Sequence, residues 1–302
     1  AGASLNLATT DSSVLVQNYN QSGGSLSGLG DFTAMNSFTK SAGIFNPSGN
    51  IYVYQTTGPL AFGDAVNAQS LRLEAANGNI TALPSAISTV GDIDIYSQGP
   101  GNLQVTGTTY QSTAGSVMVI TGGSFSVVGG ATQPALVAAN QVLDIVAAGN
   151  VNVTGTQTSA KLDSGGALTI NAGGNIIVTG GSGAGAFASI DPHDSGNITL
   201  IAQSIRLLGG SGDGAAASLI NTAPGGAIDV TAGSIKLEGG SGLGSNVTIS
   251  STTSTVSLNT SNLTLTSGTG GVATVDGTNT SLTSGKLKKE KKPKKEKKDK
   301  DD

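Results

Sequence analysis

The sequence lacks cysteine and tryptophan, and only 11% of its 302 residues are charged and 4% aromatic. The absence of cysteine excludes disulfides, zinc–thiolate sites and thiol catalysis, and it is compatible with an oxidising exterior. The scarcity of aromatic residues argues against a globular core built on large side chains, and no apolar run approaches the roughly 18 residues of a membrane-spanning helix. Glycine is abundant instead, with 46 residues, and a 37% hydrophobic content is too high for a disordered chain.

The few charged residues are unevenly distributed. Residues 1–285 carry 14 acidic and 5 basic side chains, whereas residues 286–302 carry 10 lysines and 5 acids. Charge this dense without apolar partners cannot collapse, so the tail over 286–302 is predicted to be disordered and basic. It is interpreted either as a solvated end or as a tether to an anionic surface. The lysines assigned to such a contact are Lys288, Lys289, Lys291, Lys292, Lys294, Lys295, Lys297 and Lys298.

A pair of short alternating segments recurs through most of the chain. ALTINA (167–172) alternates apolar and polar residues, as a strand with one buried face does, and NIIV (175–178) follows after Gly-Gly. The distance between successive pairs grows from about 20 to about 30 residues. One column of equivalent positions contains Ile51, Leu71, Ile93, Val117, Leu143, Leu168, Ile198, Ile228 and Val256. A second contains Ile80, Leu103, Phe125, Val151, Ile176, Ile205, Ile235 and Leu263.

This period predicts an all-β fold, a parallel β-helix (β-solenoid) with two to three short strands in each coil of about 20–30 residues. Eight or nine coils stacked about 4.8 Å apart would give a rod about 40 Å long. We expect irregular or capping coils over residues 1–50, the solenoid over 51–285 and the disordered tail over 286–302. A third strand within 183–190, 212–220 and 242–249 predicts three-sided coils toward the C-terminus.

Gly-Asn pairs precede many of the predicted strands. We expect these pairs to adopt the left-handed backbone of tight corners, and their asparagines to stack in a hydrogen-bonded ladder. The pairs lie at 49–50, 78–79, 101–102, 149–150, 174–175 and 196–197.

The segments ALTINAGGNIIVTG, AAGNVNVTG and SLRLEAANGNITAL resemble the repeat region of filamentous haemagglutinin-type exoproteins of two-partner secretion systems. The resemblance covers roughly residues 18–280. It implies a right-handed parallel β-helix, a Gram-negative source, export through an outer-membrane pore, and a secreted or surface adhesin. That family's secretion domain carries Asn-Pro motifs; here FNPSGNIY (45–52) is interpreted as an ordinary turn, and the chain as a C-terminal or internal piece.

Two groups of residues could carry chemistry. His193 lies between Asp191 and Asp194, a pattern compatible with metal binding or acid–base catalysis, but no second histidine exists and a polar loop is the preferred interpretation. Asp92 and Asp94 share one strand face, as paired carboxylates do in glycosidic cleavage or calcium-dependent lyases. Such sites also need basic residues along a groove, and residues 1–285 have five scattered ones: Lys40, Arg72, Lys161, Arg206 and Lys236.

Two recurrent motifs are assigned to structure. The tracts GGSGAGA, GGSGDGA and GGSGLGS (180–186, 209–215, 239–245) lack the ending of a phosphate-binding loop and the repeated aspartate of calcium-binding repeats, so we expect coil corners. Asn-X-Ser/Thr sequences arise from composition or mark glycosylation. They begin at Asn20, Asn79, Asn152, Asn197, Asn246, Asn259, Asn262 and Asn279.

Together these features predict the structural shaft of a secreted or cell-surface adhesin or extracellular fibre, which acts by multivalent contacts. We assign no catalytic, cofactor-binding or metal-binding residue, and expect no enzyme. Expected partners are the outer-membrane secretion pore and glycans or proteins of a host, cell surface or matrix; nucleic acid is not expected as the main ligand. The alternatives are a carbohydrate-active β-helix enzyme, a lyase or glycoside hydrolase, and a matrix or filament subunit that assembles end to end.

Overall fold

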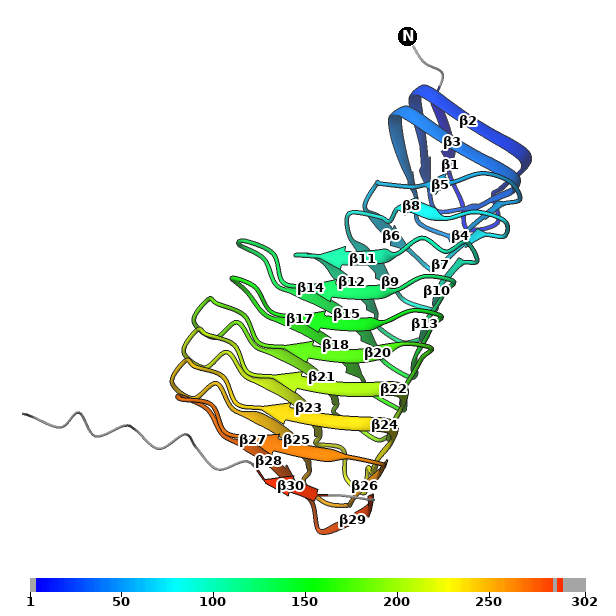
Figure 1. The fold of residues 1–302 in the computed structure, drawn as a ribbon. Coiled ribbons are helices and arrows are strands. Elements are labelled where there is room, and N and C mark those ends of the chain that lie inside the picture. Colours follow the sequence, from blue (N-terminus) through cyan, green and yellow to red (C-terminus); the bar gives the residue numbers. More distant parts are fainter. Residues whose placement is uncertain (1–3, 285–286, 290–302) are drawn as a thin grey trace, which may run out of the picture.

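The computed structural model describes residues 4–284 and 287–289, and it confirms the parallel β-helix. Coils stack along one long axis, with the N-terminal coils at one end and β29 and β30 at the other (Figure 1). All strand pairs among the described residues are parallel, and none of these residues forms a helix. The same part of the chain therefore contains no helix long and apolar enough to cross a membrane.

The coils have three sides, which we call the first, second and third faces in chain order. The first face consists of β4 (Asn50–Gln55), β7 (Ser70–Ala75), β10 (Ile93–Ser97), β13 (Val117–Thr121), β16 (Leu143–Ala147), β19 (Leu168–Ala172), the first halves of β22 (Ile198–Leu208) and β24 (Ile228–Glu238), β26 (Thr255–Thr260) and β29 (Asn279–Ser284). The second face consists of β11 (Leu103–Thr106), β14 (Phe125–Val128), β17 (Val151–Thr154), β20 (Asn175–Thr179), the second halves of β22 and β24, β27 (Leu263–Thr266) and β30 (Leu287–Lys289).

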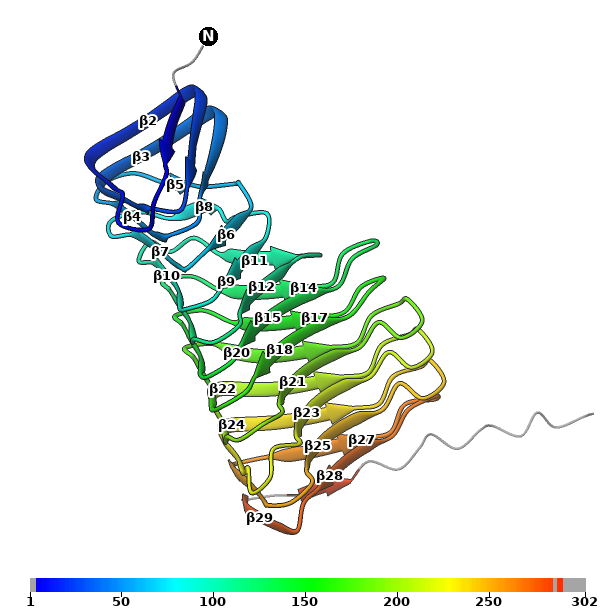
Figure 2. The same cartoon turned by 180° about the vertical axis from the view of Figure 1, so that it is seen from behind.

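The third face is a separate nine-stranded sheet that begins far earlier than expected. The sequence predicted it only toward the C-terminus, but it starts at β6, because three-residue strands such as β6 and β9 are too short to show a clear alternation in the sequence. Figure 2 shows this sheet from the opposite side to Figure 1. Its strands are β6 (Val66–Ala68), β9 (Ile87–Thr89), β12 (Thr109–Ser112), β15 (Ala135–Ala139), β18 (Ala160–Ser164), β21 (Ala188–Pro192), β23 (Ala217–Asn221), β25 (Val247–Ser251) and β28 (Ala273–Asp276).

The predicted register is confirmed along the first face and over most of the second. Ile51 pairs with Leu71 and the column continues without a shift to Val256. The second column is confirmed from Leu103 to Leu263. Its first member was wrong, because Ile80 of β8 (Ile80–Ala82) pairs with Leu60 of β5 (Leu60–Ala61) in a small separate sheet.

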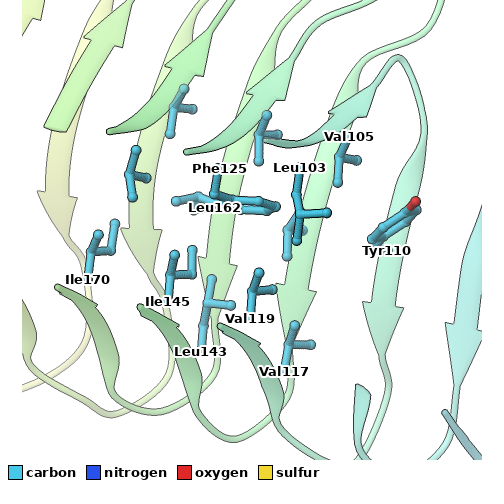
Figure 3. Close-up of a cluster of buried hydrophobic side chains, with 14 of the residues drawn as sticks. Leu103, Val105, Tyr110, Val117, Val119, Phe125, Leu143, Ile145, Leu162 and Ile170 are labelled. Atoms are coloured by element: carbon cyan, nitrogen blue, oxygen red, sulfur yellow. The ribbon is translucent and has the colours of Figure 1, made fainter. Parts of the chain in front are cut away.

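The core is a thin stack of inward side chains. Along β10 and β13 every second residue is buried, and the intervening residues face out. Figure 3 shows how side chains from the three faces meet, with Phe125, Leu162 and Leu103 directed into the same interior. Tyr110 is buried there too; its hydroxyl donates to the Pro84 carbonyl, and burial raises its pKa above the usual value.

The first coils are built from β1 (Ser4–Leu7), β2 (Ser13–Gly28) and β3 (Asp31–Pro47). Between β2 and β3 the pairing shifts register three times, so these coils are irregular, in the way expected for residues 1–50. In FNPSGNIY, β3 ends at Pro47 and β4 begins at Asn50, so the expected turn is limited to Ser48 and Gly49 between two strands. The first described coil leaves a hollow of about 630 Å³ lined by residues of β1 and β2.

The left-handed backbone predicted for the Gly-Asn pairs was wrong. None of the six glycines has a positive φ, and neither does any asparagine or other non-glycine residue among those described. Glycine is needed for a different reason: a Cβ at each of these positions would lie closer than 3.0 Å to an atom of the preceding coil. Glycines with a positive φ lie elsewhere, and three of them, Gly185, Gly214 and Gly244, lie in the glycine-rich tracts. These tracts are coil corners, as predicted.

A ladder exists, but it joins side-chain oxygens to backbone N–H groups of the next coil rather than stacking asparagine side chains on one another. Asn102 Oδ1 accepts the N–H of Ser124 at 2.9 Å, Ser124 Oγ accepts the N–H of Asn150 at 3.0 Å, and Asn150 Oδ1 accepts the N–H of Asn175 at 2.8 Å. Corner N–H groups lie where the strand ladder is interrupted, so an acceptor on the neighbouring coil satisfies them.

At the other end, β30 extends the solenoid into the segment predicted to be a disordered tail. Its backbone pairs with that of β27, with Lys288 beside Thr264 and Lys289 beside Leu265. The remaining tail lysines of the predicted anionic contact lie outside the described residues: Lys291, Lys292, Lys294, Lys295, Lys297 and Lys298.

Candidate functional site

The first face carries a polar groove on its outer surface, at β4, β7 and β10. Tyr52, Arg72 and Asp94 occupy equivalent positions on these three strands and point away from the core. They therefore form an outward column that crosses three coils. The groove around them has a volume of about 240 Å³, and Asp31, Asn50 and Asp92 also line it.

Arg72 is held between two aromatic rings. Its guanidinium carbon lies 5.3 Å from the ring centroid of Tyr52 and 4.7 Å from that of Tyr96, within the range of a cation–π contact. Arg72 Nη2 also donates to Glu74 Oε2 at 2.9 Å, and this hydrogen bond raises the pKa of the guanidinium. The charged plane is therefore fixed in place, although Arg72 is 44% exposed.

The carboxylates of Asp92 and Asp94 face the same side of the strand, as predicted, but their environments differ. Asp92 Oδ1 accepts the N–H of Ser116 on the next coil at 2.8 Å, so Asp92 is a corner cap. Asp94 sits in the groove in register with Arg72, and its pKa is raised by burial, against the lowering effect of Arg72 and with a further rise from Asp92. One of the two acids thus holds the backbone, and the other faces the groove.

The second group of predicted residues lies on the third face. His193 follows β21, and its Nδ1 is 2.9 Å from Asp163 Oδ1 on β18, while its Nε2 is 3.6 Å from Asp194 Oδ2. Lys161 Nζ lies 3.3 Å from Asp163 Oδ2 and 3.2 Å from Asp191 Oδ2. Asp163 and Asp191 are neighbours on adjacent strands, and the lysine between them offsets their repulsion.

His193 lies in a coil corner, next to the ion pairs that Lys161 forms between β18 and β21. This position agrees with the polar-loop interpretation of His193. Within residues 4–284 and 287–289, no three histidine, cysteine or acidic side chains are placed to hold a metal ion. Lys161 also lines a larger groove of about 480 Å³, which continues along the third face toward β25.

Several residues of these sites were missed or set aside by sequence reasoning. Sequence reasoning assigned no role to Tyr52 or Tyr96, and it placed Arg72 among five basic residues scattered along the chain. The sequence nevertheless indicated where they lie. Tyr52 and Arg72 are one position after a member of the first column, and Tyr96 is three positions after one. All three residues therefore face outward, on neighbouring strands. Lys161 and Asp163 could not be found in this way, because the third face was not predicted at β18.

Some of the Asn-X-Ser/Thr asparagines also hold the coils together. Asn197 Oδ1 accepts the N–H of Ala227 at 2.9 Å, and Asn246 Oδ1 accepts the N–H of Val272 at 3.1 Å. These two asparagines are therefore corner acceptors of the same kind as Asn150.

Comparison with models of known protein families, with curated proteins and with solved structures found no match for this chain. The fold and the geometry of the grooves are therefore the basis for assigning a function. The resemblance to filamentous haemagglutinin-type exoproteins stays a prediction.

Proposed function

We propose that this chain is the structural shaft of a secreted or cell-surface adhesin or extracellular fibre. The observation that carries the proposal is the unbroken register of the first face from β4 to β29, which makes the coils one continuous hydrogen-bonded rod. Such a rod presents a row of outward side chains on every coil, so weak contacts add along its length. A secretion pore and an exterior location belong to this proposal through the resemblance.

The test is to measure adhesion as a function of copy number. The chain is coupled to beads at low and high density, and bead capture is counted on cultured cells and on extracellular-matrix surfaces. Shaft-like multivalency predicts that capture at high density exceeds the sum of single contacts by about 10²-fold or more. Capture that rises only in proportion to density, or none at all, would contradict the proposal.

The basic tail provides a second measurement on the same proposal. The intact chain and a chain truncated after Gly285 are mixed with vesicles of anionic or neutral lipid. A tether predicts that only the intact chain binds anionic vesicles, and that binding falls as salt is raised, since exposed charges are screened within about 10 Å at 0.1 M salt. Equal behaviour of the two chains would favour a solvated end without a tether.

A carbohydrate-active enzyme is the second candidate, because Arg72 and Asp94 share one groove on the first face. A cleaving enzyme predicts new reducing ends, or unsaturated uronates, when the chain is incubated with a panel of neutral and acidic polysaccharides. The variants Asp94→Asn and Arg72→Gln should abolish this cleavage. Absence of cleavage products over the whole panel would remove this candidate.

A further inference from the structure

The groove on the third face, which we call the third-face groove, crosses four successive strands. Its base is a column of outward residues in one register: Lys161 on β18, Ser189 on β21, Ser218 on β23 and Thr248 on β25. Phe187 and Asn246 lie beside this column at the corner, and Phe187 is 38% exposed, although phenylalanine is usually buried. The groove thus has a hydroxyl-bearing base and an aromatic side.

Ser189 provides an independent indication that this groove is not simply a surface irregularity. Its side chain is only 6% exposed, and its Oγ has no hydrogen-bond partner. Buried hydroxyls are normally paired, so an unpaired one beside a groove needs an explanation. Ser189 lines the groove, so a ligand bound there that offers a hydrogen-bonding group would give this hydroxyl its missing partner.

The charges around the groove limit the chemistry of a ligand. Lys161 is already held by Asp163 and Asp191, and with Asp194 the cluster has three carboxylates for one lysine. A phosphate, sulfate or uronate would meet this excess of negative charge, so anionic ligands are disfavoured. Ser189 also lies on a strand paired on both sides, with β18 and β23, so no free strand edge is present there for a peptide to extend.

We propose that the third-face groove binds a neutral oligosaccharide. A pyranose ring presents hydroxyls at its edge and an apolar face of C–H groups, which match the serine and threonine column and the exposed ring of Phe187, respectively. The hydroxyl-bearing residues repeat at the rung spacing of about 4.8 Å. Successive sugars of an extended chain therefore meet successive coils. This inference rests on the proposed adhesive function and names a ligand class for it.

The test is isothermal titration of the full chain with neutral tetrasaccharides of glucose, galactose, mannose and N-acetylglucosamine, with a heparin-derived tetrasaccharide as the anionic comparison. We expect at least one neutral tetrasaccharide to bind with a Kd of about 1 mM or tighter. Two variants address the groove: Phe187→Ala removes the aromatic side, and Thr248→Tyr fills the base with an outward side chain. Each should weaken binding by about tenfold or more.

Thr199→Tyr is the matched control, because Thr199 faces outward on the first face and lies outside the groove. It should leave the affinity unchanged, and thermal unfolding should show that all three variants fold. The proposal is overturned if no neutral tetrasaccharide binds, if only the heparin fragment binds, or if binding survives in Thr248→Tyr. Titration tests only the ligand of the groove, whereas bead capture at high density tests the adhesive shaft. Failure of the groove proposal is therefore distinguishable from failure of the shaft proposal.

Discussion

The N-terminal coils and the later coils are constructed differently. In β2 and β3 a single long strand follows the turns of the coil, and β3 contacts β4, β5 and β6 in succession. From β10 onward each face carries its own short strand, except that β22 and β24 run through the first and second faces, and the pairing shows no register shift. We call these parts the irregular coils (residues 4–62) and the regular coils (residues 93–266).

The two regions also fill their interiors differently. The chain has six phenylalanines, and four of them lie in the irregular coils, where they form one aromatic cluster with Tyr19. Phe32 and Phe45 meet edge to face at 4.8 Å, and Phe38 stacks on Phe62 at 5.2 Å. The regular coils instead place valine, leucine and isoleucine in columns. Columns of similar volume can repeat without adjustment, whereas shifted coils need large rings to fill uneven space.

The largest effect should come from removing a core side chain in either region. Phe32→Ala should cost about 3–5 kcal/mol and Ile145→Ala about 2–5 kcal/mol, because both residues are fully buried. In a stack where each coil contacts its neighbours, the loss should stay local. Hydrogen exchange followed by mass spectrometry should therefore show faster exchange in residues 4–62 for the first variant and around β16 for the second. Uniform acceleration along the whole chain would contradict this separation.

The next effect concerns two glycines, one from each region, that are needed for different reasons. A Cβ at Gly210, in the regular coils, would overlap the backbone of the preceding coil, whereas Gly58, in the irregular coils, has a φ of 78° and open space around it. We expect Gly210→Ala to destabilise by about 1–3 kcal/mol or more, through overpacking. Gly58→Ala should cost about 1–2 kcal/mol, through the left-handed backbone alone.

Chemical denaturation of both glycine variants measures this difference. A further replacement by asparagine, which tolerates the left-handed region, separates the causes. It should partly restore stability at position 58 and worsen it at position 210. Equal responses at the two positions would contradict the distinction between close approach and backbone conformation.

A smaller effect is expected at the corner acceptors, which both regions share. Asp31 Oδ1 accepts the N–H of Asn50 at 2.7 Å in the irregular coils, and Asp92, directly before the regular coils, accepts the N–H of Ser116 within them. Asp31→Ala and Asp92→Ala should each cost about 1 kcal/mol, measured by denaturation. Asp92→Asn keeps the acceptor and should be nearly neutral. If Asp92→Asn instead matched Asp92→Ala, the carboxylate charge rather than the hydrogen bond would explain its position.

The smallest effect concerns Asp144, on the outer side of the first face in the regular coils. Burial raises its pKa, so the folded chain retains this proton to a higher pH than the unfolded chain does. Its contribution to stability therefore falls as pH rises above the ordinary carboxyl pKa of about 3.9. Asp144→Asn should be slightly more stable than the parent at neutral pH and equal to it at lower pH, measured by thermal unfolding. Parallel pH profiles would contradict this.

Much of the fold could be predicted because the pattern is local. Each strand of the first column alternates buried and exposed residues, and a shift by one residue would turn its apolar side chains outward, which is why the register was correct from Ile51 to Val256. The prediction failed at Ile80, where a three-residue strand leaves too little alternation. It failed again for the backbone of the Gly-Asn pairs, because a glycine that permits close approach and a glycine with a positive φ look identical in sequence.

The candidate sites were less predictable than the fold. Asp92 and Asp94 look like an equal pair in GDIDIY, and only the position of Ser116 on the next coil makes one of them a structural cap. Likewise, His193 and Asp163 are 30 residues apart and meet because β18 and β21 are adjacent. Outward side chains carry no apolar pattern that would identify their neighbours.

The amino-acid sequence by itself determined that the chain stacks as a parallel solenoid, because its inward apolar positions recur once per coil and bury themselves only when coils stack in register. The tertiary structure alone decided which outward groups meet. Arg72 lies between Tyr52 and Tyr96, and Lys161 between two aspartates, through coils of unequal length. The backbone ladder holds successive coils about 4.8 Å apart whatever the loop length, so contacts across coils depend on where each loop returns the chain to the ladder.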